Sequence, residues 1–124
     1  MFLKSNNNVT EFAFEESRLI DQHADVLMGC LVIYRQLRVL SLSHDEIDDS
    51  AFSKICVYLK GMRELQKLDI SYNDVTDNSL GVILSIMINK DTILKSMNIS
   101  HNKIKNIQTI MEFKYKMEII NKND

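Results

Sequence analysis

Apolar residues recur along the chain with a period of 28 or 29 residues. Four blocks share the spacing, and they read VTEFAFEESRL, LRVLSLSHDEI, LQKLDISYNDV and LKSMNISHNKI from Val9, Leu37, Leu65 and Leu94. Counted from the first residue of each block, the first, fourth, sixth and eleventh places are apolar in all four. A unit of this length cannot bury its apolar face alone, so we expect the blocks to stack side by side around one core.

Each block predicts a short strand followed by a helix. Places four and six are apolar and enclose a small or polar residue, which is the period-two pattern of a strand with one buried face. We therefore predict strands at residues 12–14, 40–42, 68–70 and 97–99, joined in one parallel sheet. Apolar residues at helical spacing follow in the first three blocks, and these are Ala24, Leu27, Met28 and Leu31; Phe52, Ile55, Cys56 and Leu59; and Leu80, Ile83, Leu84 and Met87. This spacing buries one side of each helix, so the pattern favours an α/β fold with the helices on one side of the sheet.

The thirteenth place holds Asp21, Asp49, Asp77 and Asn106 in successive blocks. Asp and Asn side chains accept hydrogen bonds from the free amides of a helix's first turn, so we predict that this column caps the helices. A Ca²⁺ or Mg²⁺ site would need carboxylates gathered in one loop, and these are spread over the blocks. We expect no metal there.

The two ends of the chain depart from the pattern. Apolar residues in the last block fall out of step with the others, so we expect an irregular helical cap from residue 107 and a C-terminal tail over residues 119–124. Residues 1–8 form an N-terminal extension too short for a helical hairpin, which predicts an unpaired strand edge near Phe12. The predicted domain covers residues 9–118.

The blocks resemble leucine-rich repeats, whose pattern is L-x-x-L-x-L-x-x-N-x-L, and their length is similar to that of the ribonuclease-inhibitor-like class. The resemblance implies a right-handed α/β solenoid, a short horseshoe arc of about four repeats with the parallel sheet on the concave face and the helices on the convex face. In this family the ninth-place asparagine bonds backbone amides of the turn between repeats. It is present as Asn73 and Asn102 but is replaced by Ser17 and Asp45, so we expect looser turns in the first two blocks.

Composition bounds the kind of protein. With 124 residues, 45% hydrophobic and 26% charged, the chain fits one soluble globular domain, and a net charge of −2 argues against nucleic acid as the partner. No apolar run reaches the roughly 18 residues of a membrane span, and the first residues lack the apolar core of a signal peptide. Two cysteines without regular spacing favour a reducing compartment. We predict an intracellular location, with the cytoplasm favoured.

The sequence carries no recognisable catalytic or cofactor-binding motif. His44 and His101 share the eighth place two blocks apart, which sets their anchors ~10 Å from each other, too far to share a zinc ion. No nucleophile has a base beside it in a known motif, and there is no glycine-rich phosphate loop. We expect a protein that is not an enzyme and binds neither metal nor cofactor.

Places five, seven and eight are expected to point away from the core, where this architecture usually binds its partners. The eighth place carries the bulk, as Glu16, His44, Tyr72 and His101, and tyrosine is enriched among interface hot spots. We take eight residues of this face as candidates for partner binding: Glu15, Glu16, Ser43, His44, Asp69, Tyr72, Asn98 and His101.

Three functions fit these patterns. The first is a module or scaffold that binds a protein partner through its concave face. The second is a small subunit docked into a large assembly through the ends of the solenoid, because residues 9–36 hold five acidic and two basic residues whereas residues 94–124 hold three acidic and six basic. The third is a regulator of a small GTPase, as some longer members of the class are, although no functional residue of theirs can be matched to this chain.

Overall fold

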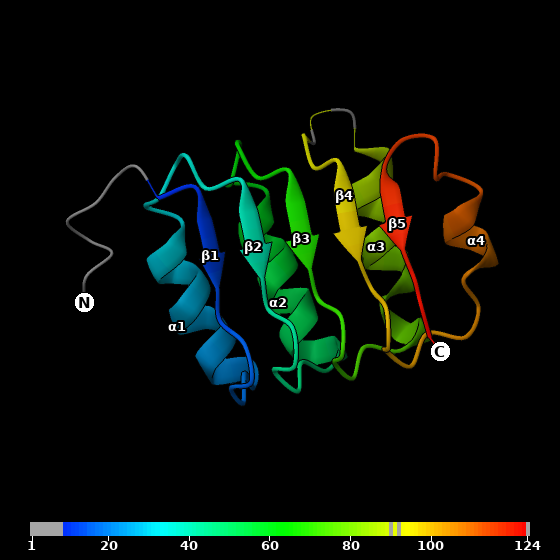
Figure 1. Ribbon diagram of the computed structural model, residues 1–124, viewed down its shortest axis with the longest axis horizontal. Helices are drawn as coiled ribbons and strands as arrows, with labels where there is room; N and C mark the ends of the chain where they lie inside the picture. The colour runs from blue at the N-terminus through cyan, green and yellow to red at the C-terminus, as the bar shows by residue number, and fades with distance from the viewer. Residues whose placement is uncertain (1–8, 90, 92, 124) are drawn as a thin grey trace.

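The computed structural model describes residues 9–89, 91 and 93–123, so the expected N-terminal extension, 1–8, lies outside the described residues. Five strands form one parallel sheet in the order of the sequence (Figure 1). They are β1 (Glu11–Ala13), β2 (Val39–Ser41), β3 (Lys67–Asp69), β4 (Ser96–Asn98) and β5 (Glu118–Ile120). The single parallel sheet predicted from the blocks is confirmed.

A helix follows each of the first four strands in the sequence. The helices are α1 (Asp21–Leu31), α2 (Asp49–Leu59), α3 (Leu80–Ile88), preceded by the 3₁₀ turn η2 (Asp77–Ser79), and α4 (Gln108–Met111). Helices α1, α2 and α3 lie behind the sheet, and α4 lies beside β5 at its end (Figure 1). The other side of the sheet, the open face, carries the residues at place five of each block. This arrangement is the α/β fold that the two periodicities predict.

The strand register confirms the alignment of the blocks. Phe12, Leu40, Leu68, Met97 and Ile119 lie opposite one another in one row across the five strands. The strands begin one residue earlier than the pattern indicates, a shift within the usual uncertainty of element ends.

The core lies between the sheet and the helices. Leu40, Leu42, Leu68 and Ile70 are at most 1% exposed, and Phe52 of α2 is fully buried against them. Burial of this apolar row is the main term that stabilises the fold, at roughly 1.5–3 kcal/mol for each large side chain.

The predicted caps are wrong, because the thirteenth-place acids bond to the following block instead of their own helix. The true caps are Asp48, which accepts from the Ala51 amide at 2.9 Å, and Thr76, which accepts from the Asn78 amide at 3.1 Å. Asp49 accepts from the Thr76 amide at 2.9 Å, the Thr76 hydroxyl at 2.5 Å and the Ser79 hydroxyl at 2.6 Å.

The neighbours of Asp49 repeat this arrangement. Asp21 accepts from the Ser50 hydroxyl at 2.5 Å, and Asp77 accepts from the amides of Lys105 and Asn106 at 2.7 and 3.1 Å. The acidic column therefore ties each block to the next.

The C-terminal segment also differs from the prediction. Only α4 is helical in the stretch expected as a helical cap. The domain was expected to end at residue 118, but β5 continues past that residue and pairs with β4. β5 follows β4 by 22 positions, from Met97 to its partner Ile119, so it falls outside the 28-residue period that revealed the other strands.

Two further features bear on function. Cys56 is buried, as its place in the helical pattern indicates, and burial raises the pKa of its thiol to about 12. In the part of the chain that the structure describes, no helix has the length and apolar character needed to cross a membrane.

Candidate functional site

Three aromatic rings form a continuous stack on the molecule, and we call His44, Tyr72 and His101 the ring ridge. The ring centroids of His44 and Tyr72 are 4.3 Å apart with 14° between the planes, and those of Tyr72 and His101 are 4.1 Å apart with 11°. The alignment of the blocks predicts this juxtaposition, because residues at the same place of neighbouring blocks lie about one strand spacing apart. Tyr72 is 47% exposed, so the ridge presents ring edges to solvent.

The ridge is built on left-handed backbone. Glu16, His44, Tyr72 and His101 have φ values of 58°, 61°, 57° and 56°. This region is unfavourable for residues with a side chain, by roughly 1–2 kcal/mol each. The repeated conformation turns the chain sharply after each strand and brings the eighth side chain of every block to the same line.

Backbone and side-chain bonds hold this conformation. The amide of Tyr72 donates to the carbonyl of Ser100 at 2.9 Å, and the amide of His44 donates to that of Ser71 at 3.3 Å. Below them, the Asn73 side chain accepts from the amides of Asp45 and Ile47, both at 2.9 Å.

The Asn73 amide group completes this turn. It donates to the carbonyls of Leu42, Ile70 and Ser71 at 2.9 to 3.1 Å. Asn102 repeats the pattern one block later, with a bond from the Val75 amide at 2.9 Å and bonds to the carbonyls of Ile70 and Ile99. The role that the resemblance implies for the ninth-place asparagines is present at both positions.

Asp45 takes the asparagine's place in the second block, but its side chain makes one hydrogen bond where the Asn73 side chain makes five. One carboxylate oxygen accepts from the Ser17 amide at 2.8 Å, while the other, Oδ2, is buried with no hydrogen-bond partner among the described residues. Burial raises the pKa of Asp45 to about 6, and the charge of Glu15 adds to this, whereas the Ser17 amide and His44 act against it. The carboxyl group is fully buried, so its ionisation affects stability.

The seventh-place serines do not point to solvent as expected. Ser43, Ser71 and Ser100 are 6%, 5% and 4% exposed, and the hydroxyls of Ser43 and Ser71 lie 3.1 Å apart. The left-handed residue that follows each serine turns the chain, so the alternation of the strand does not continue to place seven. Ser43 is therefore buried beside Ser71 and does not present its hydroxyl at the surface.

The other predicted site residues surround the ridge. Asp69 accepts from the amide of Ser71 at 2.8 Å, and Asn98 accepts from the amide of Ser100 at 3.0 Å, so both fix the turn that leads to a ring. Glu15 is exposed and accepts a short hydrogen bond from the Ser41 hydroxyl.

Glu16, at the eighth place of the first block, is exposed, and its amide donates to the carbonyl of Ser43 at 3.3 Å. Sequence reasoning missed the exposed acid Glu46, which also has a left-handed backbone, with φ of 55°. Its signal was a second acid, directly after Asp45, in the loop that follows His44.

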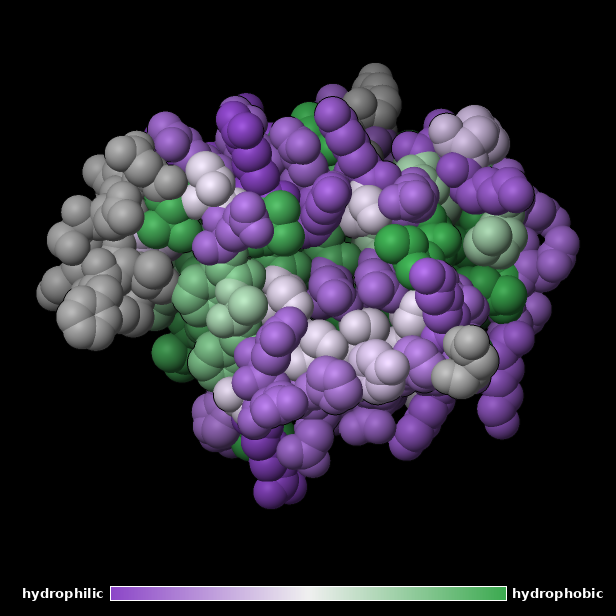
Figure 2. Space-filling view, in the orientation of Figure 1, coloured by the Kyte–Doolittle hydropathy of each residue, from purple (hydrophilic) through white to green (hydrophobic). Residues whose placement is uncertain are grey.

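The ring ridge offers an exposed contact surface. Among residues 9–89, 91 and 93–123, no three His, Cys, Asp or Glu side chains gather in a way that could hold a metal ion. Figure 2 shows hydrophilic surface over the middle of the sheet, with hydrophobic surface toward the β1 side and toward the β5 side. A rigid, exposed aromatic line on such a face is suited to contact another macromolecule.

Comparison with known proteins supports the fold. No protein-family model matches the chain, and no curated protein matches it. Among five solved chains that match, one is Leiomodin-1 Actin-Binding Site 2 (ABS2), with a TM-score of 0.73 and 18% sequence identity over 98% of this chain and 74% of that chain. At this identity the similarity shows a shared fold.

Proposed function

We propose that the chain is a non-enzymatic protein-interaction module that binds its partner across the open face, with the ring ridge at the centre of the contact. The observation that carries the proposal is the stack of His44, Tyr72 and His101, three rings held in line on left-handed backbone. Backbone strain of this kind persists only where the surroundings enforce it, and it is concentrated at functional sites.

The stack favours binding because its side chains are already ordered. An aromatic side chain that is held between two others loses little conformational freedom when a partner covers it, so most of the contact energy appears as affinity. Tyrosine at the centre of a contact is a frequent hot spot, and the histidines on either side can exclude water around it.

Charge near the ridge indicates what the partner carries. Glu46 lies two residues after His44, Asp74 lies two residues after Tyr72, and Glu16 continues the row of the rings at its β1 side. Both faces of the Tyr72 ring are covered by the histidine rings, and Asp74 already pairs with Lys103 at 3.3 Å. A cation from the partner would therefore pair with the exposed carboxylates of Glu16 and Glu46. We infer that the contacting segment of the partner carries arginine or lysine.

The same proposal assigns the chain to the leucine-rich repeats. The blocks, the parallel sheet and the asparagine bonds at Asn73 and Asn102 support a short right-handed solenoid of the ribonuclease-inhibitor-like class, with four repeats and β5 closing the last one. In such a solenoid the open face is the concave side, where a partner is surrounded by the ends of several strands.

Actin is the first partner to test, because a solved chain with this fold is named as an actin-binding site. An intracellular location belongs to the same proposal. The experiment is co-sedimentation with filamentous actin and equilibrium binding to monomeric actin, with a pull-down from lysate and mass spectrometry if actin does not bind. Whichever protein binds, its retention should fall for Tyr72→Ala and stay for Val57→Ala, which removes an exposed side chain on α2, outside the open face.

A partner that binds wild type and Tyr72→Ala equally would overturn the proposed face. Circular dichroism melts of both variants provide the folding control, since each change is at an exposed side chain.

A further inference from the structure

The core is uncovered at the β1 side among the described residues. Val9, Phe12 and Phe14 are only partly buried, whereas their counterparts 28 residues later, Leu37, Leu40 and Leu42, are at most 1% exposed. The apolar residues of the second block pack against the first block, whereas no described residue precedes Val9. The position of the first block therefore explains the difference in burial.

Helix α1 shows the same feature. Val26 is 68% exposed and Leu27 partly buried, while their counterparts in α2 contact the preceding block: Lys54 pairs with Asp25 at 3.0 Å and Ile55 is fully buried. Val26 and Leu27 therefore occupy positions that elsewhere in the chain touch a preceding unit. Together with Val9, Phe12 and Phe14 they form what we call the β1 end.

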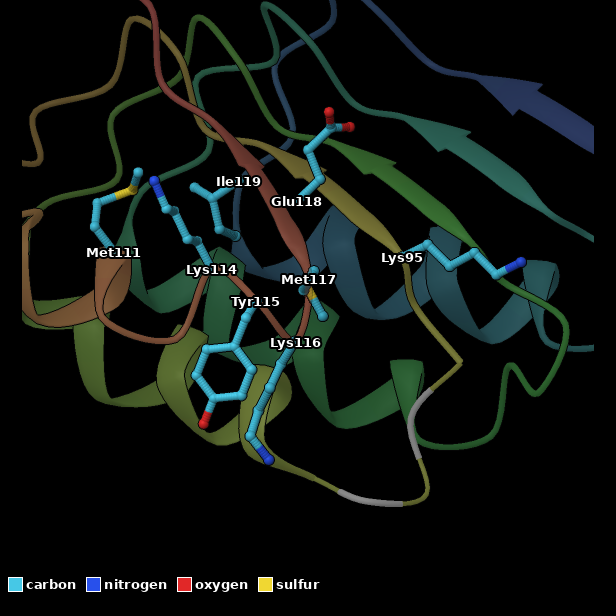
Figure 3. A pocket seen from close by; sticks show the side chains of 8 residues that line it. All are labelled: Lys95, Met111, Lys114, Tyr115, Lys116, Met117, Glu118 and Ile119. Carbon is cyan, nitrogen blue, oxygen red and sulfur yellow. The ribbon is translucent and has the colours of Figure 1, made fainter.

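The opposite side of the molecule carries apolar residues beside a hollow of ≈ 420 Å³ (Figure 3). Met111, Met117 and Ile119 line it together with Tyr115, which is 75% exposed. Lys114 and Lys116 come from the same wall, and the Lys116 ammonium lies 5.8 Å from the Tyr115 ring centroid. We call these six residues the β5 end.

Each end also has a strand edge. The amide of Glu118 donates to Lys95 and the carbonyl of Ile120 accepts from Ile99, so both face β4 and the groups of Ile119 between them point outward. By the same alternation, the groups of Glu11 and Ala13 in β1 point away from β2. β1 and β5 run in the same direction, so β5 of one copy could lie beside β1 of another as a further parallel strand.

Charge decides between the possible orientations of two copies. Residues 9–36 carry a net charge of −3 and residues 94–124 a net charge of +3. Two β1 ends facing each other would bring two copies of the exposed Glu11 together, and like charges at an interface disfavour that orientation. Glu11 of β1 against Lys114 and Lys116 of a β5 end adds charge attraction to the apolar contact.

We propose that the β1 end of one molecule docks on the β5 end of a second copy, so that the chain associates head to tail. Such an interface uses two different surfaces and leaves one of each free, so it grows beyond a dimer unless the turn between copies closes a ring. The open face and its ring ridge are not used and stay available along the assembly.

The first measurement is sedimentation equilibrium of the full chain over a wide concentration range, at low and high salt and under reducing conditions so that Cys30 cannot form disulfides. We expect a mass that rises with concentration through dimer to larger species and an association that weakens with salt. A full chain that stays monomeric throughout overturns the proposal.

Two variants identify the surfaces. Val26→Lys blocks the β1 end by repulsion, and Lys114→Glu with Lys116→Glu blocks the β5 end. Each should raise the dissociation constant of self-association at least about tenfold. Mixed in equal amounts, they retain one intact end each and should form a dimer of two different chains that does not grow further.

Val57→Lys is the matched control, because Val57 is also 68% exposed but lies on α2, between the two ends. It should associate like wild type. A mixture of the two end variants that stays monomeric, or a single variant that still forms a closed dimer, would show a symmetric contact and overturn head-to-tail docking. Association that appears only after removal of residues 1–8 would make that segment the occupant of the β1 end, which also overturns the proposal.

Discussion

The rings of Tyr72 and His101 lie face to face, with 4.1 Å between centroids and 11° between planes, although the two residues are 29 positions apart in the sequence. Both have left-handed backbone, so the stack combines a favourable side-chain contact with an unfavourable backbone at each residue. This combination keeps an aromatic surface ordered at the cost of some stability.

Replacement of Tyr72 should separate the two effects. Tyr72→Ala loses the ring contacts but keeps the left-handed backbone, whereas Tyr72→Gly removes the backbone penalty, since glycine adopts φ near 57° freely. We expect Tyr72→Gly to be more stable than Tyr72→Ala by roughly 1 kcal/mol in urea melts. Equal stabilities, or a less stable glycine variant, would mean that the backbone at this position is not strained.

The core prediction concerns the middle strand. Leu68 is 1% exposed in the row that crosses all five strands, so Leu68→Ala should reduce the free energy of unfolding by about 2–5 kcal/mol. The exposed Val57→Ala on α2 should change it by less than about 0.5 kcal/mol. If Leu68→Ala reduced the free energy of unfolding by less than Val57→Ala does, the strand register would be contradicted.

The hydrogen bonds by which the thirteenth-place acids tie each block to the next can be tested at Asp49. Burial acts to raise the pKa of this carboxyl, but the hydrogen bonds from Ser79 and Thr76 lower it overall. Because Asp49 holds three donors of the next block, Asp49→Ala should cost about 1.5–3 kcal/mol. Asp48→Ala, which removes a helix cap beside it, should cost only about 1 kcal/mol. If chemical denaturation showed a larger loss of stability for Asp48→Ala than for Asp49→Ala, the assignment of Asp49 to the contact between blocks would be contradicted.

The buried carboxyl of Asp45 should make stability depend on pH. Its folded pKa of about 6 is above the ordinary value of 3.8, so the folded state binds the proton more tightly than the unfolded state. Unfolding free energy should therefore be highest below the unfolded value and should fall as pH rises through about 6.

The variant Asp45→Asn tests this assignment. An asparagine can donate to carbonyls of the turn as Asn73 does, so the variant should be more stable than wild type at pH 8 by roughly 1–3 kcal/mol and should lose the pH dependence between pH 4 and 6. Glu46→Gln removes an equal charge from an exposed position nearby and should leave the pH dependence unchanged. A wild-type stability that rises with pH over this window would contradict the assignment.

The sequence predicted those parts of the fold that repeat. Periodicity identifies Leu40 and Leu68 as neighbours, and the shared eighth place brings His44, Tyr72 and His101 into one row, because each position is constrained by its counterparts in other blocks. β5 was missed because Ile119 follows Met97 by 22 residues and belongs to no repeat of that length.

Local turn geometry could not be predicted in the same way. The cap position lies at Asp48 and Thr76 instead of Asp49 and Asp77, because two adjacent polar residues compete for it and the competition depends on the donors that the next block presents. The burial of Ser43 depends on the left-handed backbone of His44 after it. A histidine in the sequence gives no indication of that conformation.

The affinity of the partner for wild type and for two variants, Tyr72→Ala and Val57→Ala, tests the proposed binding face most directly. With actin, or with the protein recovered in the pull-down, isothermal calorimetry of Tyr72→Ala should show a dissociation constant raised about 30-fold or more, the effect of losing a hot-spot contact of about 2 kcal/mol. Val57→Ala, which removes a side chain that is 68% exposed on α2 away from the ridge, should stay within about twofold of wild type. Equal affinities for wild type and Tyr72→Ala would contradict a function based on the ring ridge.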